Sequence, residues 1–281
     1  MMLLKNTYNE FIKIVAKPRS YLGFGALTLL ISIIIFAMKV DGETMVSFIT
    51  ASFEQTLTFN GKLVNGNLIA FIILQMLVVH IPLLVALVTG DLISGEAAMG
   101  TIRMLATKPL SRSQIVLSKF LAGAIYTLLL TIWLGILALF VSHLVFGSGD
   151  LMVLNSDGLV ILQEADILWR FGLGFCVAFL SLLTVATLSI CLSAFAENSV
   201  GPIVATMAII ILFTIIGTLD VTVFDNIKPY LFTTHMVAWR SFFEDPVPYD
   251  LIYQSIIVLV AHIVVLISIT LYKFNKKDIT S

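Results

Sequence analysis

The chain has 281 residues, of which 59% are hydrophobic and 12% charged, with a net charge of −1 and a mean hydropathy of +1.06. Soluble domains carry about 25% charged residues, so this composition excludes an ordinary soluble domain and predicts an integral membrane protein. The sequence has no basic tract or aromatic stacking platform, and we expect no nucleic-acid partner.

Residues 1–19 predict an amphipathic helix at the inner membrane surface. Its apolar face carries Leu4, Tyr8, Phe11, Ile12 and Val15, and lysines surround the other face. Pro18 ends the helix, because the residue before a proline avoids the helical region. Two roles remain open, a simple membrane anchor or a lever packed against the first inner loop. The segment lacks the compact apolar core of a cleavable signal peptide, so we expect the first span in the mature protein.

Six apolar runs are long enough to cross a bilayer, which takes about 20 helical residues. They cover residues 21–38, 68–88, 120–146, 171–195, 200–219 and 253–272. If both termini share one side, 11 of the 16 lysines and arginines fall on that side, and the positive-inside rule then places both termini in the cytoplasm. The predicted fold is one all-α, six-span domain over residues 1–281.

Three segments are expected on the outer side as small extracellular elements. Residues 40–67 hold a short apolar helical stripe and then Asn60-Gly61, a hairpin turn signal. Residues 147–169 hold two apolar runs around NSDG, which predicts a small β-hairpin. The proline-rich and aromatic segment 220–251 predicts short helices.

The inner loop, residues 91–119, predicts two helices separated by a proline. Ser94 is the expected cap of the first, which would run from Gly95 toward Thr107. Gly100 then lies inside a helix, where glycine costs about 1 kcal/mol relative to alanine, and would allow a partner to approach closely.

Spacings of four and three residues put Glu96, Gly100 and Arg103 on one face of this first helix. Pro109 breaks the helix, and Ser111 and Gln114 form a capping box for the next one. The loop is thus either a docking element for a cytoplasmic partner or a solvated connector whose charges set the topology.

The stretch GEAAMGTIRMLATKPLSRSQIVLSKF, residues 95–120, resembles the signature of permease subunits of ABC-2 type (type-2) ABC exporters. The residues that match the pattern are Glu96, Gly100, Thr101, Pro109, Ser111, Arg112 and Lys119. The opening FIKIVAKPRSYLGF and the stretch LSICLSAFAENSVGPIVA between the fourth and fifth spans are also similar to that family. The likeness covers most of the chain and is weakest in the outer segments.

The resemblance implies a permease that moves a substrate while a separate ABC ATPase subunit binds and hydrolyses ATP with Mg²⁺. It implies no catalytic residue and no cofactor in this chain, which agrees with the lack of a G-x-x-x-x-G-K-[ST] sequence. A second permease copy or a homologous permease, and a prokaryotic plasma membrane, are implied as well. The residues implied to couple to the ATPase in the cytoplasmic coupling loop are Glu96, Gly100, Thr101, Arg103, Pro109, Ser111 and Arg112.

Polar groups inside predicted spans are functional candidates because they are costly in the bilayer. Gln75, His80 and Pro82 lie in the second span and are candidates for a kinked pathway helix. His80 and His262 could instead form hydrogen bonds between helices, and no metal-ligand spacing appears. The alternative function is a nucleotide-independent channel, secondary carrier or membrane scaffold. The transported substrate, and homodimer versus heterodimer, remain open.

Overall fold

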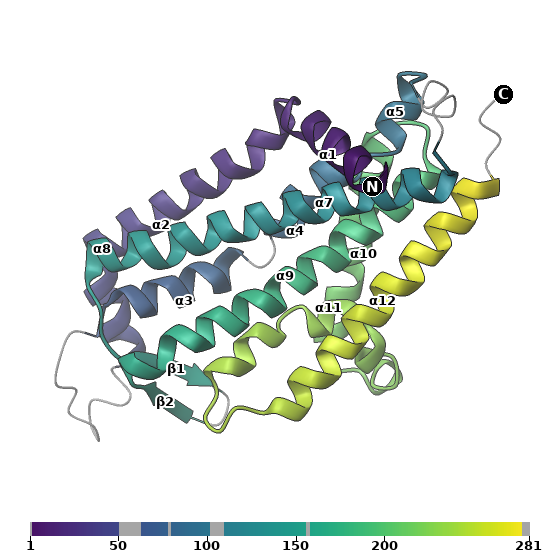
Figure 1. Ribbon diagram of the computed structural model, residues 1–281. Coiled ribbons are helices and arrows are strands. Elements are labelled where there is room, and N and C mark those ends of the chain that lie inside the picture. The colour runs from purple at the N-terminus through teal and green to yellow at the C-terminus, as the bar shows by residue number, and fades with distance from the viewer. Residues whose placement is uncertain (1, 51–62, 78–79, 102–109, 156–157, 277–281) are drawn as a thin grey trace.

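The computed structural model describes residues 2–50, 63–77, 80–101, 110–155 and 158–276. Its longest helices run lengthwise beside one another, and α1 lies across them at one end (Figure 1). In chain order the longer elements are α1 (Met2–Val15), α2 (Arg19–Thr50), α3 (Gly66–Leu77), α4 (His80–Thr89), α5 (Ser94–Ala98), α7 (Arg112–Gly135), η1 (Ile136–Val141), α8 (Ser142–Phe146), β1 (Leu151–Asn155), β2 (Gly158–Leu162), α9 (Glu164–Phe195), α10 (Val200–Thr218) and α12 (Tyr249–Lys276).

Within the described ranges, five helical stretches are long and apolar enough to cross a bilayer, namely Arg19–Met45, Arg112–Phe146, Glu164–Phe195, Val200–Thr218 and Tyr249–Lys276. The chain is therefore a mostly helical, multi-pass membrane protein. The expected second span, 68–88, is not one straight helix. Its two parts, α3 and α4, differ in direction by 57°. Pro82 lies in the first turn of α4, where the missing N–H does not interrupt a helix.

The two ends of the bundle differ in character. α1, α5 and the last turns of α12 lie at one end, and α8 with the β1–β2 hairpin lies at the other (Figure 1). We call these the polar end and the hairpin end. α1 ends at Val15 and α2 begins at Arg19, as the proline at position 18 predicts.

α9 is the central helix of the bundle, and it packs against α4, α7, α10 and α12. Its apolar window is 61% buried, whereas the corresponding windows of the other spanning helices are at most 33% buried. Small hydroxyl residues permit this close packing. Those buried on α9 are Ser181, Thr184, Thr187, Ser189 and Ser193. These five residues therefore occupy packing positions on the central helix.

The predicted hairpin in residues 147–169 is confirmed. β1 and β2 are antiparallel, with Val153 opposite Val160 and Asn155 opposite Gly158. The strands extend further than the sequence predicted, because Asn155 and Gly158 pair instead of belonging to a four-residue turn. The other predicted hairpin, at Asn60-Gly61, lies outside the described residues.

The start of α3 holds the chain that leads into the hairpin. Asn65 Nδ2 donates to the Asp150 carbonyl at 2.7 Å, and Asn67 Nδ2 donates to the Gly149 carbonyl at 2.7 Å. Between them the Gly66 N–H donates to the Gly147 carbonyl at 2.8 Å. This approach brings two backbones together, which leaves no room for a side chain at position 66.

We expect Gly66→Ala to destabilise the protein by about 1–3 kcal/mol, the usual cost of overpacking. An added Cβ would lie 2.7 Å from the Gly147 carbonyl oxygen and 2.8 Å from the His143 Cα, and backbone atoms cannot turn aside. The unfolding temperature in detergent measures the effect. Gly172→Ala is the matched control, since a Cβ there meets nothing within 4 Å. Equal stability of the two variants would contradict this account of the contact.

Short helices form in segment 220–251, as the sequence predicted. They are η2 (Thr222–Phe224), η3 (Lys228–Tyr230), α11 (Phe232–His235) and η4 (Ala238–Phe243). His235 fastens α11, because its Nδ1 lies 2.9 Å from the Ser255 hydroxyl and its Nε2 lies 2.9 Å from the Pro229 carbonyl oxygen. η4 packs against α9 and α12.

Candidate functional site

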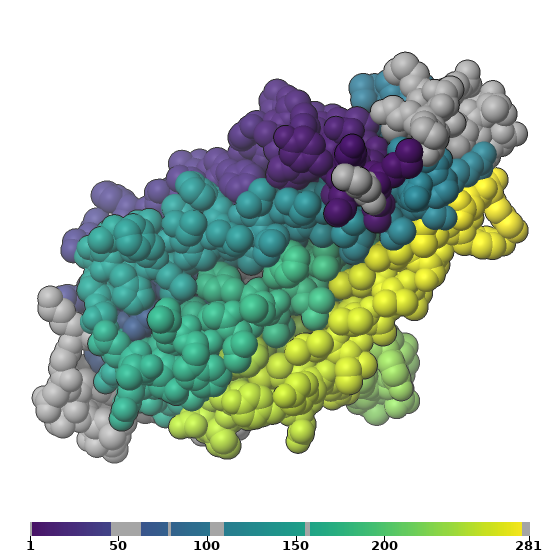
Figure 2. Space-filling view, viewed as in Figure 1, coloured from purple at the N-terminus to yellow at the C-terminus, as the bar shows by residue number. Residues whose placement is uncertain are grey.

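The amphipathic helix α1 packs with its polar face toward the protein. Asn6 and Glu10 are buried, and Asn6 Nδ2 donates to the Ser118 hydroxyl of α7 at 2.6 Å. Leu4 and Tyr8 on the apolar face are 71% and 65% exposed. The space-filling view shows α1 lying over α7 (Figure 2). The apolar face is thus exposed, and the polar face makes specific contacts.

Four charged side chains at the polar end form a closed cycle that we call the ion ring: Glu10, Lys13, Glu96 and Lys119. Lys13 Nζ lies 2.6 Å from Glu10 Oε1 and 2.7 Å from Glu96 Oε1. Lys119 Nζ lies 2.7 Å from the second oxygen of each carboxylate. Its contact with Glu96 Oε2 is a close ion pair without the alignment of a hydrogen bond. The ring joins α1, α5 and α7.

Burial makes the ring sensitive to the loss of any member. The side chain of Lys119 is 1% exposed and that of Glu10 is 3% exposed. A charge at such depth is costly unless it is paired. Burial alone would raise the pKa of Glu10, but the ammonium groups of Lys119 and Lys13 outweigh it and hold this pKa below its ordinary value. Burial would lower the pKa of Lys13, but Glu10 and Glu96 raise it above its ordinary value.

The ring should therefore contribute most to stability between the ordinary pKa values of its groups, 4.5 for Glu10 and 10.5 for Lys13. A lowered carboxylate pKa gives stability that is present above pH 4.5 and is lost as the pH falls through the folded value. A raised lysine pKa gives stability that is present below pH 10.5 and is lost as the pH rises through the folded value.

Unfolding temperatures measured across pH test this dependence. The Glu10→Gln variant should lose less of its remaining stability than the natural protein when the pH falls below 4.5, because position 10 no longer titrates. If the unfolding temperatures of the two proteins fell in parallel below pH 4.5, this result would contradict the contribution assigned to Glu10.

A second ion cluster surrounds Asp91, in the turn between α4 and α5. Its Oδ2 accepts from Lys17 Nζ at 2.6 Å and lies 2.9 Å from an Arg19 nitrogen. The Ser199 hydroxyl of the α9–α10 turn donates to Oδ1 of the same carboxylate. Asp91 thus links the α1–α2 junction to the α9–α10 turn. An added Cβ at Gly95 would collide with this carboxylate, so the tight fit requires glycine there.

The first helix of the inner loop is shorter than predicted, and two expectations about it are wrong. α5 spans Ser94–Ala98, and Ser94 is its first residue instead of its cap. The Ser94 hydroxyl donates to the Gly90 carbonyl at 2.9 Å. The N–H groups of Ile93 and Ser94 instead donate to the Ser193 hydroxyl of α9, at 3.2 and 2.8 Å. The N–H groups at the start of α5 are therefore bonded by a residue about a hundred positions away in the sequence.

Gly100 ends α5 and does not lie inside a helix. Its φ is +69°, and its N–H donates to the Ala97 carbonyl at 3.0 Å. The Thr101 N–H donates to the Glu96 carbonyl at 3.0 Å. This pair of bonds is a Schellman motif, in which glycine takes the left-handed position. Glu96 and Gly100 therefore do not form one helical face, and Arg103 and Pro109 lie outside the described residues.

The second helix of the inner loop begins as predicted. The Ser111 hydroxyl accepts from the Gln114 N–H, and the Gln114 side chain accepts from the Ser111 N–H, which completes the capping box. Arg112 Nη1 donates to the Asn275 carbonyl at 2.8 Å. Arg112 thus also contacts the last turn of α12.

The residues proposed for coupling occupy different environments. Glu96 is buried in the ion ring, whereas Ser111 and Arg112 are exposed, as are Met99 and Gly100. An exposed surface around the end of α5 and the start of α7 therefore lies directly beside a buried ring. The sequence predicted no role in the site for Glu10, Lys13 or Asp91. A buried role for Lys119 was signalled only by its place beside a long apolar run.

The three pathway candidates lie in different surroundings within the chain. Gln75 is exposed on α3, His80 is exposed at the start of α4, and Pro82 is buried. His80 Nδ1 lies 3.2 Å from the Met76 carbonyl oxygen, and His262 Nδ1 lies 2.8 Å from that of Val258. His80, at the start of α4, thus contacts the last turn of α3, whereas His262 bonds one turn back within α12 and not to another helix, as one interpretation expected. Among the described residues, no group of histidine, cysteine and carboxylate side chains could hold a metal ion.

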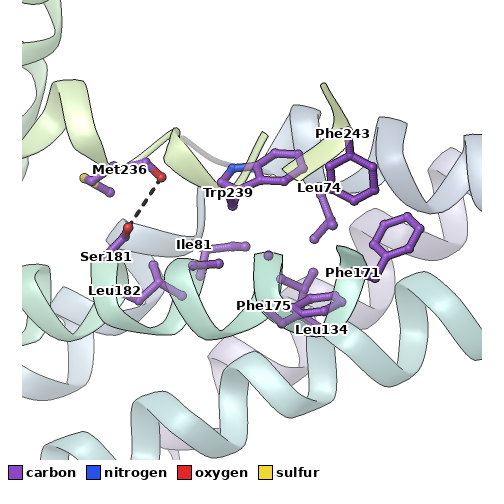
Figure 3. A pocket seen from close by; sticks show the side chains of 12 residues that line it. Leu74, Ile81, Leu134, Phe171, Phe175, Ser181, Leu182, Met236, Trp239 and Phe243 are labelled. Carbon is purple, nitrogen blue, oxygen red and sulfur yellow. Dashed lines mark hydrogen bonds between the residues drawn. The ribbon is translucent and has the colours of Figure 1, made fainter. Parts of the chain in front are cut away.

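A small apolar cavity of about 40 Å³ lies where α3 gives way to α4. Leu74 and Ile81 line it from these two helices, and Phe171, Trp239 and Phe243 close it from α9 and η4 (Figure 3). The Ser181 hydroxyl contacts the Met236 carbonyl at one edge, at 3.4 Å. Leu74 near the end of α3 and Ile81 near the start of α4 therefore face an aromatic cluster.

The apolar helices and the buried ion clusters at one end define a multi-pass helical membrane protein. The chain belongs to the family described as "Protein of unknown function (DUF2705)", whose model matches residues 28–280. It is also similar to "Uncharacterized protein YhcI" of Bacillus subtilis (strain 168), with 30% identity over 118 residues. That match covers 40% of this chain and 37% of the length of the relative.

Proposed function

We propose that this chain is the membrane-spanning permease subunit of an ATP-driven exporter of the ABC-2 type, coupled to a separate ATPase subunit. The ion ring carries the proposal. It joins the amphipathic helix α1 and the inner-loop helix α5 to α7. α7 begins the apolar helical stretch Arg112–Phe146, which ends at the hairpin end. The resemblance of residues 95–120 to the permease signature supports the same assignment.

In this mechanism the ATPase binds the exposed surface beside α5, and the ring passes its motion on. Displacing α5 moves Glu96, and moving Glu96 away from Lys119 separates two charges whose side chains are 8% and 1% exposed, which is costly. α1 and α7 therefore move with α5 as one body. Asp91 extends the same connection to the α9–α10 turn through Ser199. ATP and Mg²⁺ bind to the partner, and this chain holds no cofactor.

The proposal also assigns the orientation. The polar end faces the cytoplasm of a prokaryotic plasma membrane, and the hairpin end faces outward. A second permease copy, or a homologous permease, completes the pathway.

Site-specific cross-linking from native membranes tests the docking surface. Met99 lies at the end of α5 and is 61% exposed, and Leu144 on α8 at the hairpin end is 69% exposed. A photoreactive group is attached to Met99→Cys in a chain whose Cys176 and Cys191 are replaced by alanine. The expected adduct contains a chain with a G-x-x-x-x-G-K-[ST] motif, identified by mass spectrometry.

Leu144→Cys in the same background is the matched control and should give no such adduct. Failure of the position 99 group to capture an ATPase, together with export or assembly that is unaffected by ATP depletion, would favour a nucleotide-independent channel, carrier or scaffold.

A further inference from the structure

A cleft of about 610 Å³ opens at the hairpin end, between α3, the β1–β2 hairpin and η4 with the chain that follows it. Its size falls in the range of small-molecule sites, about 300–1,000 Å³. Phe71, Val153 and Val160 give it an apolar wall. Gln75, Arg240 and Glu244 give it polar groups. None of these groups belongs to the ion clusters at the polar end.

Arg240 is the unexplained group of this cleft. Its Nε is buried, and no acceptor in the described part of the chain binds it. The guanidinium lies over the ring of Trp239, with 5.8 Å between Cζ and the ring centroid. Burial lowers the pKa of Arg240 below its ordinary value, which reflects a charge that is desolvated. Buried donors without partners are rare in folded proteins and call for an acceptor.

Arg170, at the same end of the bundle, has a purely structural role that contrasts with that of Arg240. Arg170 donates from Nη1 to the carbonyls of Phe242 and Glu244, at 2.7 and 2.9 Å, and pairs with Asp166. It fixes the backbone that carries Glu244 and borders Arg240. Arg170 thus holds the backbone at Glu244 in place, while the Nε of Arg240 has no acceptor in the described part of the chain.

The cleft combines opposite charges with apolar surface. The Glu244 and Asp245 side chains line it with Arg240, and neither forms a salt bridge with that guanidinium. A guanidinium binds phosphate or carboxylate through paired N–H donors, whereas carboxylates attract an ammonium group. A purely anionic ligand would meet two carboxylates, so a ligand with both charges fits this set better.

We propose that the cleft binds an amphiphile with a zwitterionic phosphate–amine headgroup. Arg240 contacts the phosphate, Glu244 and Asp245 contact the ammonium, and the Gln75 amide adds a hydrogen bond. The apolar wall of Phe71 and the hairpin valines covers the start of the hydrocarbon chain. This site does not depend on coupling to an ATPase, and failure to capture an ATPase leaves it untouched.

Native mass spectrometry of the full chain in detergent tests the site, with short-chain phosphatidylethanolamine as the probe. Short-chain phosphatidylglycerol lacks the amine, and phosphoethanolamine lacks the chains. We expect saturable binding of one phosphatidylethanolamine per chain, weakened about tenfold to a hundredfold by Arg240→Gln, the equivalent of one charged hydrogen-bonded contact. Glu244→Gln combined with Asp245→Asn should abolish the preference over phosphatidylglycerol.

Lys228→Gln, in the same segment but outside the cleft, is the matched control and should bind as the natural protein does. Unfolding temperatures of all variants identify any loss of fold. Undiminished binding by a folded Arg240→Gln variant would overturn the site. Phosphoethanolamine that binds as tightly as the lipid would overturn the amphiphile and assign a free zwitterion to the same groups.

Discussion

Lys119→Met is expected to destabilise the protein by about 3–5 kcal/mol, the range found when one partner of a buried ion pair is removed. Lys119 is the most buried member of the ion ring, and its loss leaves Glu10 and Glu96 facing each other with one cation, Lys13, which is half exposed. Unfolding in detergent followed by circular dichroism measures the loss. α1 should also become more accessible to protease, since it loses a main tie to α7.

Two further variants give this prediction its control and its rescue. Lys5→Met makes the same substitution at an exposed position of α1 and should change stability little. The triple variant Glu10→Gln, Glu96→Gln, Lys119→Met removes all but one charge of the ring and should recover much of the loss. If Lys119→Met were as stable as Lys5→Met, this result would contradict the role given to the ring.

The triple variant also separates stability from coupling. The triple variant can pack with Lys13 as the one remaining charge of the ring, but no ion pair then resists the movement of position 96 away from position 119. If the ring transmits motion, the triple variant should fold and still bind the ATPase, while ATP hydrolysis loses its dependence on the permease. Normal coupling in a folded triple variant would assign the ring a structural role alone.

Arg170→Met is expected to have the second largest effect, about 2–4 kcal/mol. The guanidinium loses two bonds to backbone carbonyls and its pair with Asp166, and hydrogen bonds to charged groups each contribute about 1.5–3 kcal/mol. The loss should be local. Hydrogen exchange of amides in residues 238–246 should rise, and that of α1 should not.

Arg170→Lys is the informative companion variant, because lysine keeps the charge but cannot bind two carbonyls and a carboxylate in a planar arrangement. The stability of Arg170→Lys should lie between that of the natural protein and that of Arg170→Met. Unchanged exchange in residues 238–246 for both variants would show that other contacts fix this segment.

Much of the fold follows from local sequence, because spans, caps and hairpins depend on neighbours in the chain. The apolar runs predict the long helices, Ser111 and Gln114 predict the start of α7, and NSDG predicts the hairpin. The break between α3 and α4 was signalled by Pro82, but run length alone made 68–88 a single span.

The site could not be predicted in the same way, because its contacts join distant residues. Nothing near Glu10 in the sequence indicates that it meets Lys119, 109 positions away. The prediction that Gly100 lies inside a helix was wrong because a glycine fits both a helix interior and a Schellman motif at a helix end. Only the length of α5 decides between these two positions. The prediction that Ser94 caps α5 was wrong because the Ser193 hydroxyl of α9 accepts the hydrogen bond from the helix start.

Purification from native membranes in mild detergent, followed by mass spectrometry of the chains that co-purify in stoichiometric amounts, tests the central claim most directly. The proposed function predicts a soluble ATPase with a phosphate-binding G-x-x-x-x-G-K-[ST] motif in fixed ratio to this chain. Absence of any ATPase, under conditions in which the permease oligomer survives, would contradict it.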